Sequence, residues 1–294
     1  MPKNLTRRSF FKHFFGGLLA LGGFSTVGYY YAHEIEPHQL EITNHSLISP
    51  SLPRGFNGLK IVQFSDTHIG FQYTLEQFQN LMGKINELEP DIIVFTGDLM
   101  DNPTEFEETE KIVQSLRTLN SKLGKFAVYG NHDHGGYGSD IYRKIIQDSG
   151  FNLLVNDSNS IQLIDGSSIH IAGVDDSMLG QPDLGRALTD IQGDNSYTIL
   201  LSHAPDFADY AATYNIQLQL SGHSHGGQIQ IPVYGPLVMP PYAEKYPEGF
   251  YHLGENNRLT LYVNRGLGTT RLPFRFWSKP ELTLFTLYQK GVNG

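Results

Sequence analysis

Two histidines stand one residue apart in the segment LSGHSHGGQ, residues 220–228. His223 and His225 directly follow residues 216–220, whose alternation of apolar and polar side chains is typical of a β-strand. Neutral imidazole is the commonest side-chain ligand for divalent transition ions, so both rings are candidate metal ligands. The alternative is a polar Gly/Ser turn that happens to contain two histidines. A metal site therefore requires further ligand residues elsewhere in the chain.

Several other short runs of β-branched or aromatic residues also stop at side chains that bind metals. Residues 59–65 lead into Asp66 and His68, 91–96 into Asp98, 125–129 into Asn131, His132 and Asp133, and 198–202 into His203. Each run is long enough for a buried strand and ends at a residue type found in metal sites. Together with residues 216–221, the sequence predicts five strands that end at candidate ligands.

The segments between the first strands carry helix signals. Thr74 and Gln77 have capping-box spacing, and apolar residues then recur on one helical face until Pro90. Thr104 and Glu107 repeat that spacing before the apolar positions of 112–119, and residues 139–150 predict a third helix that ends at a glycine. Strands alternating with helices predict parallel strands whose carboxyl ends face one side. Because ligands bind beyond those ends, we expect the five strand ends to share one crevice.

These blocks, taken in chain order, resemble the complete signature of the calcineurin-like metallophosphoesterases. The resemblance covers residues 59–226 and consists of Asp66-Thr67-His68, Gly97-Asp98, Gly130-Asn131-His132-Asp133, His203 and Gly222-His223-Ser224-His225. It is specific because it requires many fixed residue types after separate strands. It implies an α/β fold of the metallophosphoesterase type, a β-sandwich flanked by helices, with a dinuclear metal site at the strand carboxyl ends.

The resemblance also implies a ligand set for two divalent metal ions. Asp98 would bridge them, Asp66, His68 and His225 would complete one site, and Asn131, His203 and His223 would complete the other. Two such ions clamp a phosphoryl group and activate a bridging water, so the expected activity is phosphoester hydrolysis. Mixed nitrogen and oxygen ligands without sulfur favour Mn, Fe or Zn.

His132 and Asp133 are the predicted catalytic residues. In the family, the histidine that follows the ligand Asn131 lies near the phosphate and protonates the leaving oxygen, and Asp133 would orient it or raise its pKa. The alternative for His132 is that it only binds the substrate phosphate. Asp101 is a candidate for supporting a ligand, while Gly97 and Gly130 are expected to permit close backbone approach.

Composition limits the remaining possibilities. The 294 residues are 39% hydrophobic, and no linker divides residues 59–294, which we interpret as one catalytic domain after a proline-containing lead-in at 36–58. The net charge of −9 lacks the basic footprint of a nucleic-acid binder, so no nucleic acid is expected. The absence of cysteine excludes a thiolate metal site, which leaves His, Asp, Glu and Asn as ligands.

The N-terminus resembles a twin-arginine export signal. TRRSFFK, residues 6–12, precedes the uncharged apolar residues 14–32, and we interpret 1–35 as a twin-arginine signal or an N-terminal membrane anchor. The expected partner is the twin-arginine export machinery, and the expected location is outside the bacterial cytoplasmic membrane, associated with the membrane or the cell wall. With this signal the chain resembles the exported YkuE/YaeI-type branch of the family.

The substrate is the least determined feature. Arg265, Arg271 and Arg275 lie among apolar and aromatic residues of 272–277, a mixture that could hold a phosphate headgroup at a membrane surface, or could instead pack and pair structurally. The branch includes lipid-linked diphosphate hydrolases, which favours a phosphodiester or pyrophosphate on a lipid-linked or cell-envelope substrate. Two rival functions are a non-catalytic envelope-binding module with this fold and a zinc peptidase, whose His-Glu-x-x-His motif the sequence lacks.

Overall fold

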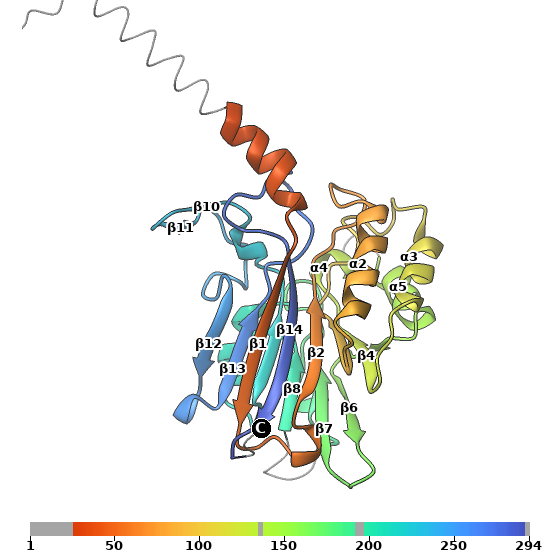
Figure 1. Cartoon of the computed structure of the whole chain (residues 1–294), viewed down its shortest axis with the longest axis vertical. Coiled ribbons are helices and arrows are strands. Elements are labelled where there is room, and N and C mark those ends of the chain that lie inside the picture. Colours follow the sequence, from red (N-terminus) through yellow and green to blue (C-terminus); the bar gives the residue numbers. More distant parts are fainter. Residues whose placement is uncertain (1–25, 135–137, 192–196, 292–294) are drawn as a thin grey trace, which may run out of the picture.

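Two six-stranded sheets lie face to face in the computed structural model, which describes residues 26–134, 138–191 and 197–291 (Figure 1). The first sheet has the order β1 (Glu41–Ser49), β14 (Glu281–Gln289), β2 (Leu59–Phe64), β3 (Ile92–Phe95), β4 (Gly124–Ala127), β5 (Asn152–Leu153). The second has the order β12 (Gly249–Leu253), β13 (Leu259–Val263), β9 (Leu218–Ser221), β8 (Tyr197–Leu201), β7 (Ser168–Gly173), β6 (Asp157–Gln162). The predicted β-sandwich is confirmed.

The main core fills the space between the two sheets. Ile61 of β2, Ile199 of β8 and Phe285 of β14 belong to this cluster and are fully buried. Burying a side chain of this size stabilises the fold by roughly 1.5–3 kcal/mol. The core therefore fixes the position of one sheet relative to the other, and with it the relative position of the strand ends.

Helices cover the outer faces of both sheets. On the first sheet, α2 (Leu75–Glu87), α3 (Thr109–Arg117) and α5 (Ser139–Asp148) lie side by side (Figure 1) and share an apolar cluster with β2 and β3. On the second sheet, the short helices α6 (Leu184–Ala187) and α7 (Ala208–Ala211) pack on a smaller cluster. The predicted flanking helices are thus confirmed on both sides of the sandwich.

The predicted helix boundaries agree in part. Helix α2 begins with the predicted capping box, in which Thr74 Oγ1 accepts from the backbone of Gln77 and the Gln77 side chain accepts from the backbone of Thr74. The second capping box is wrong, because α3 begins only at Thr109. The Asn102 side chain instead accepts from the backbone and hydroxyl of Thr104, which forms an Asx turn where the helix was expected.

The segment before the catalytic domain is part of the fold. Residues 26–30 are helical and continue into the π-helical turn Tyr31–Ile35 and the 3-10 turn Glu36–His38. The chain then enters β1, which pairs in parallel with β14. The twin-arginine motif at 6–12 lies outside the described residues. Within the described part of the chain, no helix combines the length and apolar character needed to cross a membrane.

The sheets place the predicted strand ends at one edge of the molecule. Strands β2, β3 and β4 are parallel, with Phe64 beside Phe95 and Phe95 beside Ala127. Strands β8 and β9 of the other sheet are also parallel, with Leu201 beside Leu220. The residues that follow these five strands therefore meet where the carboxyl ends of the two sheets converge.

Candidate metal centre

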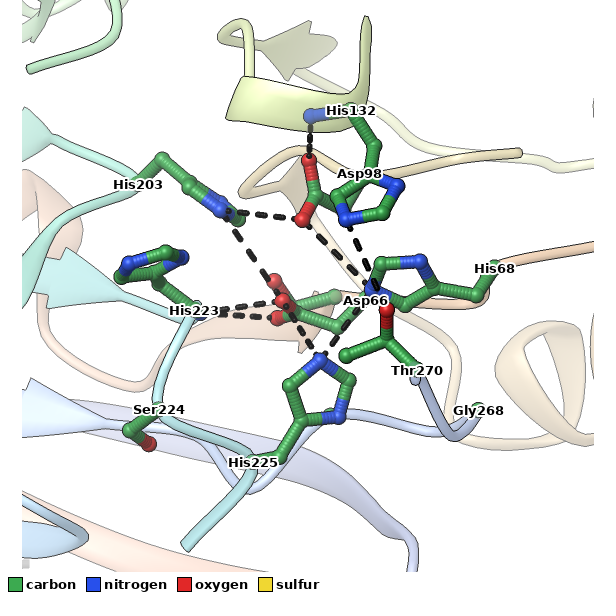
Figure 2. Close-up of polar contacts among 12 residues, drawn as sticks. Asp66, His68, Asp98, His132, His203, His223, Ser224, His225, Gly268 and Thr270 are labelled. Atoms are coloured by element: carbon green, nitrogen blue, oxygen red, sulfur yellow. Dashed lines mark hydrogen bonds and ion pairs between the residues drawn. The ribbon is translucent and has the colours of Figure 1, made fainter. Parts of the chain in front are cut away.

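All seven predicted ligand residues come together at this edge. Asp66 and His68 follow β2, Asp98 follows β3, Asn131 begins the short helix α4 (Asn131–His134), and His203, His223 and His225 follow β8 and β9. Figure 2 labels six of them, Asp66, His68, Asp98, His203, His223 and His225, around one central space. The aspartates and histidines of the set are buried, none more than 5% exposed, so their donor atoms are shielded from bulk water.

The first ligand group consists of Asp66, His68 and His225. Their ligand atoms lie within 4.8 Å of one another. His68 Nε2 is 3.1 Å from His225 Nε2, and His225 Nε2 is 3.5 Å from Asp66 Oδ1. These separations allow the three side chains to bind one cation, as the family resemblance implies.

The second ligand group consists of Asp98, His203 and His223, whose ligand atoms also lie within 4.8 Å of one another. His203 Nδ1 donates to the carbonyl of Thr96 at 2.6 Å, and His223 Nε2 donates to the carbonyl of Pro241 at 2.8 Å. A carbonyl only accepts, so these contacts fix which nitrogen carries the hydrogen. The free ligand atoms are therefore Nε2 of His203 and Nδ1 of His223.

Asp98 lies between the two groups. Its Oδ2 is 3.3 Å from His203 Nε2 and 3.5 Å from His68 Nε2, while its Oδ1 accepts from the backbone N–H of His132 at 2.8 Å (Figure 2). One carboxylate thus faces a histidine of each group. This is the position that a shared ligand between two cations must occupy.

The donor set fits two divalent cations. Asn131 Oδ1 is buried without a hydrogen-bond partner, which is costly unless a cation occupies the space that it faces. His203 Nε2 faces Asp98 Oδ2 at 3.3 Å. The carboxylates of Asp66, Asp98 and Asp133 are also buried within this small region. Such a concentration of negative charge away from water is stable when cations are bound to it.

The surroundings also set the protonation of the ligand histidines. Burial lowers the pKa of His223 to about 3, and burial together with His68 and Arg275 lowers the pKa of His225 well below its ordinary value. Both rings are therefore neutral at neutral pH, which is the form that binds metals. Burial also disfavours the charged form of His203, but the carboxylates of Asp98, Asp66 and Asp176 together outweigh burial and hold the pKa of His203 well above its ordinary value.

The ligand residues have unusual backbone conformations. Asp66, His68, Asp98, His223 and His225 all adopt a left-handed conformation, with φ between 43° and 66°. Each such residue costs free energy, and residues of this kind cluster at functional sites. Five of the seven ligand residues therefore have a backbone that turns the side chain away from the strand direction and toward the centre.

Two glycines make room for the carboxylates. A Cβ on Gly130 would overlap Asp98 Oδ1, and a Cβ on Gly222 would overlap Asp66 Oδ2. The close backbone approach that was predicted at Gly130 is confirmed. At Gly222 the requirement is the same, since a side chain there would displace a carboxylate from the ligand group.

His132 lies at the margin of the ligand groups, about a quarter exposed. Its Nδ1 donates to the carbonyl of Asp101 at 2.7 Å, and its Nε2 lies 3.5 Å from Thr270 Oγ1. Burial acts to lower the pKa of His132, but Asp98, the Asp101 carbonyl and the carboxylates of Asp101 and Asp133 outweigh it and raise the pKa. The ring is thus fixed by one nitrogen and can carry a proton on the other.

Asp133 does not orient the His132 ring. Its carboxylate accepts from the backbone N–H groups of Gly130 and Asp98, both at 2.8 Å, and of Leu99 at 3.0 Å. This aspartate therefore joins the loop after β3 to the loop after β4. Burial, together with the neighbouring Asp98, raises the pKa of Asp133 itself to about 7, and Asp133 makes only a small contribution to the raised pKa of His132. The predicted electrostatic role of Asp133 stays a prediction.

Asp101 and Thr270 complete the surroundings of His132. Asp101 Oδ1 is 3.1 Å from His68 Nδ1 and 3.3 Å from Thr270 Oγ1. A carboxylate behind a ligand histidine fixes its tautomer and increases its basicity, which is the supporting role predicted for Asp101. Thr270 was not predicted, since it lies 138 residues beyond His132 and no spacing in the sequence marks it.

Two of the three arginines considered for headgroup binding are structural. Arg275 is fully buried and donates to the carbonyls of Gly268, Ser278 and Arg265. Arg265 pairs with Glu41 and with Glu281. Their side chains are used within the fold, so the headgroup interpretation is wrong for both. Arg271 is exposed beside the site.

Comparison with known proteins agrees with this geometry. A family model described as calcineurin-like phosphoesterase matches residues 59–227. Those residues include the carboxyl ends of all five strands and every ligand residue named above. The matched segment is more than half of the chain and ends just after His225.

Two relatives and one solved structure illustrate the similarity. The metallophosphoesterase YkuE of Bacillus subtilis is 48% identical over 99% of this chain and 100% of its own length. The UDP-2,3-diacylglucosamine pyrophosphatase LpxG of Chlamydia trachomatis is 31% identical over 86% of this chain and 91% of its own. A dimetal phosphatase from Danio rerio aligns with a TM-score of 0.43 and 10% identity, covering 79% of this chain and 93% of its own.

Proposed function

Because this chain belongs to the calcineurin-like phosphoesterase family and is a phosphoester hydrolase, we propose that it cleaves a phosphodiester or a pyrophosphate carried by a lipid-linked or cell-envelope molecule. The observation that carries the hydrolytic part is the position of Asp98 Oδ2, which faces His203 of one ligand group and His68 of the other. When bound there, two divalent cations supply Lewis acidity toward the phosphoryl oxygens and a nucleophile at neutral pH.

The side chains of the centre then have distinct tasks. The ligand histidines are held in one tautomer by the carbonyls of Thr96 and Pro241, so their free nitrogens are oriented before any ion arrives. Asp66 accepts from the backbone N–H of His223, which joins the loop after β2 to the loop after β9. These contacts fix the positions of both ligand groups before a substrate phosphate approaches.

His132 is the proton donor in this proposal. Its Nδ1 is committed to the Asp101 carbonyl, and its Nε2 lies beside Thr270 at the pocket that the ligand residues also line. The nearby carboxylates raise its pKa, so the ring keeps a proton to a higher pH than a free imidazole does. A protonated imidazole at this position can transfer its proton to the departing oxygen.

The substrate class rests on similarity and on charge. LpxG, whose name states a pyrophosphatase acting on a diacylated sugar nucleotide, shares 31% identity with this chain over most of both proteins. The exposed Arg271 lies in the same pocket as His132 and provides a cation for a second phosphate. Both points favour a substrate that carries a diphosphate or a diester rather than a simple monoester.

The proposed location follows from the N-terminal sequence. Residues 6–12 read TRRSFFK before an uncharged apolar stretch, a pattern typical of twin-arginine export. This route would deliver the folded chain, with its ions already bound, to the outer side of the cytoplasmic membrane. An envelope substrate would then be within reach of the enzyme.

The test uses the full chain, stripped of metal and assayed with Mn²⁺ restored. An aryl phosphodiester, the matching monoester and a lipid-linked diphosphate are compared at equal concentration. We expect hydrolysis only with metal, and a larger kcat/KM for the diester or the diphosphate than for the monoester. A preference for the monoester, or no hydrolysis by a chain shown to bind two ions, would contradict the proposal.

A further inference from the structure

An exposed apolar surface borders the metal centre. We define the apolar rim as residues 229–243 together with Leu272 and Trp277. No charged residue occurs from Gly226 to Ala243, and the rim exposes large side chains, namely Ile231, Val233, Tyr234, Leu237, Val238, Tyr242, Leu272 and Trp277. Scattered exposed apolar residues are ordinary, but a continuous group of them beside a site indicates a binding surface.

The rim is a built structure. Its hairpin pairs β10 (Gln230–Ile231) with β11 (Gly235–Pro236), and Val233 at the tip is fully exposed with a φ of 74°. The hairpin is tied to the loop that carries Trp277, because Gln230 donates to the carbonyl of Phe276 at 2.8 Å. A β-branched residue rarely adopts a positive φ, and strain of this kind is typical of functional segments.

The rim continues into the catalytic pocket. One cavity of about 230 Å³ is lined by Asp98, His132 and His223 and also by Leu237, Val238 and Leu272. A molecule that fills it touches both buried ligand residues and exposed aliphatic side chains. The shape suits a ligand with a phosphate head and an apolar tail.

The N-terminal segment arrives at the same end of the molecule. Figure 1 shows the helix that begins at residue 26 beside β10 and β11. Tyr29 packs on Phe274 and Tyr31 on Phe276, with ring centroids 5.3 Å and 6.1 Å apart. Residues 14–25, which precede this helix, contain no charged side chain. The sequence that precedes the segment packed beside the rim is therefore apolar.

The composition of the rim is that of a membrane interface. Tyrosine and tryptophan prefer the boundary between headgroups and acyl chains, and Tyr234, Tyr242 and Trp277 are all exposed here. Arg271 and Lys279, both exposed, add positive charge beside the rim, as anionic headgroups require. A surface that binds a protein partner usually has polar residues around its apolar centre.

We propose that the apolar rim inserts into the interface of a lipid bilayer and holds the metal centre over the membrane. As far as it concerns the substrate, the proposal rests on the phosphoesterase function above. A docked enzyme would receive an amphiphile whose phosphate reaches the ligand groups while its acyl chains stay beside Leu237, Val238 and Leu272. The substrate class is then a phosphate-bearing membrane lipid.

Trp277 provides the measurement, because it is the only tryptophan of the chain. The full chain, loaded with Mn²⁺, is mixed with vesicles of phosphatidylcholine and phosphatidylglycerol. We expect brominated lipids to quench Trp277, and vesicles to reduce its quenching by aqueous acrylamide roughly twofold. Equal acrylamide quenching with and without vesicles would overturn the proposal. So would protection of Trp277 from acrylamide in a dimer formed without vesicles, if vesicles added no further protection.

The matched variants place the same charge on the rim and far from it. Val233→Asp changes the hairpin tip, whereas Ile164→Asp changes an equally exposed side chain in the turn between β6 and β7, which lies at the opposite end of the molecule in Figure 1. We expect the rim variant to lose the protection of Trp277 and the control to keep it. Both variants keep the N-terminal segment. Any affinity of that segment for vesicles therefore contributes equally to both, and a difference between the variants reports on the rim.

A second readout does not depend on those aspartates. The chain has no cysteine, so Val233→Cys and Ile164→Cys each carry a single polarity-sensitive fluorophore. Vesicles should shift the emission at 233 and leave that at 164 unchanged, and equal responses would overturn the proposal. Hydrolysis of a soluble aryl phosphodiester is measured alongside. Its absence in chains that still dock would refute the proposed function while leaving the docking surface intact.

Discussion

His203 Nε2 lies 3.3 Å from Asp98 Oδ2, while Nδ1 of the same ring donates to the carbonyl of Thr96 at 2.6 Å. Burial acts to lower the pKa of this histidine, but Asp98, with Asp66 and Asp176, outweighs burial and raises the pKa well above its ordinary value. Without metal, a proton on Nε2 therefore compensates the buried carboxylate. A cation that binds between the two side chains takes the place of that proton.

Metal binding should accordingly release protons. The pKa of His203 is raised, so the ring is still protonated at neutral pH and the affinity for metal should rise with pH until that proton is lost. Titration calorimetry of Mn²⁺ into the metal-free chain, in two buffers of different ionisation enthalpy, gives the number of protons released. A binding enthalpy independent of the buffer would contradict this account.

Asp98→Asn should remove the shared ligand. The amide keeps the size of the side chain but loses the charge that faces both ligand groups. Loss of a correctly bound metal pair removes several kcal/mol of transition-state stabilisation. We expect a fall in kcat on the order of 1,000-fold or more at saturating metal. Metal analysis should find fewer than two bound ions. Wild-type rates would rule out the two-metal assignment.

His132→Ala should slow the reaction according to the leaving group. Loss of a proton donor typically costs about 100- to 10,000-fold when the departing oxygen is basic. Across a series of aryl esters with decreasing leaving-group pKa, the rate of the variant should approach that of the wild type, because a good leaving group departs without being protonated. Bound metal should stay at the wild-type level. A uniform loss across the ester series would instead assign His132 to phosphate binding.

Asp101→Asn should act on both histidines that it contacts. Replacing the carboxylate 3.1 Å from His68 should weaken metal binding by about 10- to 100-fold. At saturating metal, removing a negative charge lowers the pKa of His132, so the alkaline limb of kcat/KM should move to lower pH. An unchanged pH profile would limit Asp101 to supporting His68.

Removal of residues 26–38 should destabilise the catalytic domain. The Ala32 carbonyl accepts from Arg275 at 2.9 Å, the Glu36 side chain accepts from Ser278 at 2.6 Å, and Tyr29 packs on Phe274. Together these contacts are worth roughly 2–4 kcal/mol. Thermal unfolding of chains that begin at residue 26 and at residue 39 measures the difference. Equal melting temperatures would show that the segment is not needed for stability.

Local signals predicted the strands and the candidate ligand types that follow them, whereas the family resemblance implied the sandwich. The ligand types follow strands whose apolar runs are short and uninterrupted, and helix α2 has its capping box within four residues of sequence. Thr104 and Glu107 carry the same spacing, but Asn102 competes for the backbone and forms a turn. Short motifs therefore sufficed where no neighbouring side chain offered the backbone another partner.

Contacts between distant segments could not be predicted in this way. Thr270 lies beside His132 although the two residues are far apart in the sequence. The buried guanidinium of Arg275 donates to the backbone carbonyls of Gly268 and Arg265. Asp133 is adjacent to His132 in sequence, yet the helical turn of α4 directs its carboxylate to backbone amides of the β3 loop. Such roles depend on tertiary packing, which spacing along the chain does not encode.

Strand β14 lies between β1 and β2, so the last strand of the chain joins two of the earliest ones. During synthesis, the sheet that carries Asp66 and Asp98 stays divided until residues 281–289 have left the ribosome. A chain that stops before residue 281 would expose the unpaired edges of β1 and β2, which can pair with other chains and cause aggregation. The order of the strands thus makes completion of the active sheet depend on the synthesis of residues 281–289.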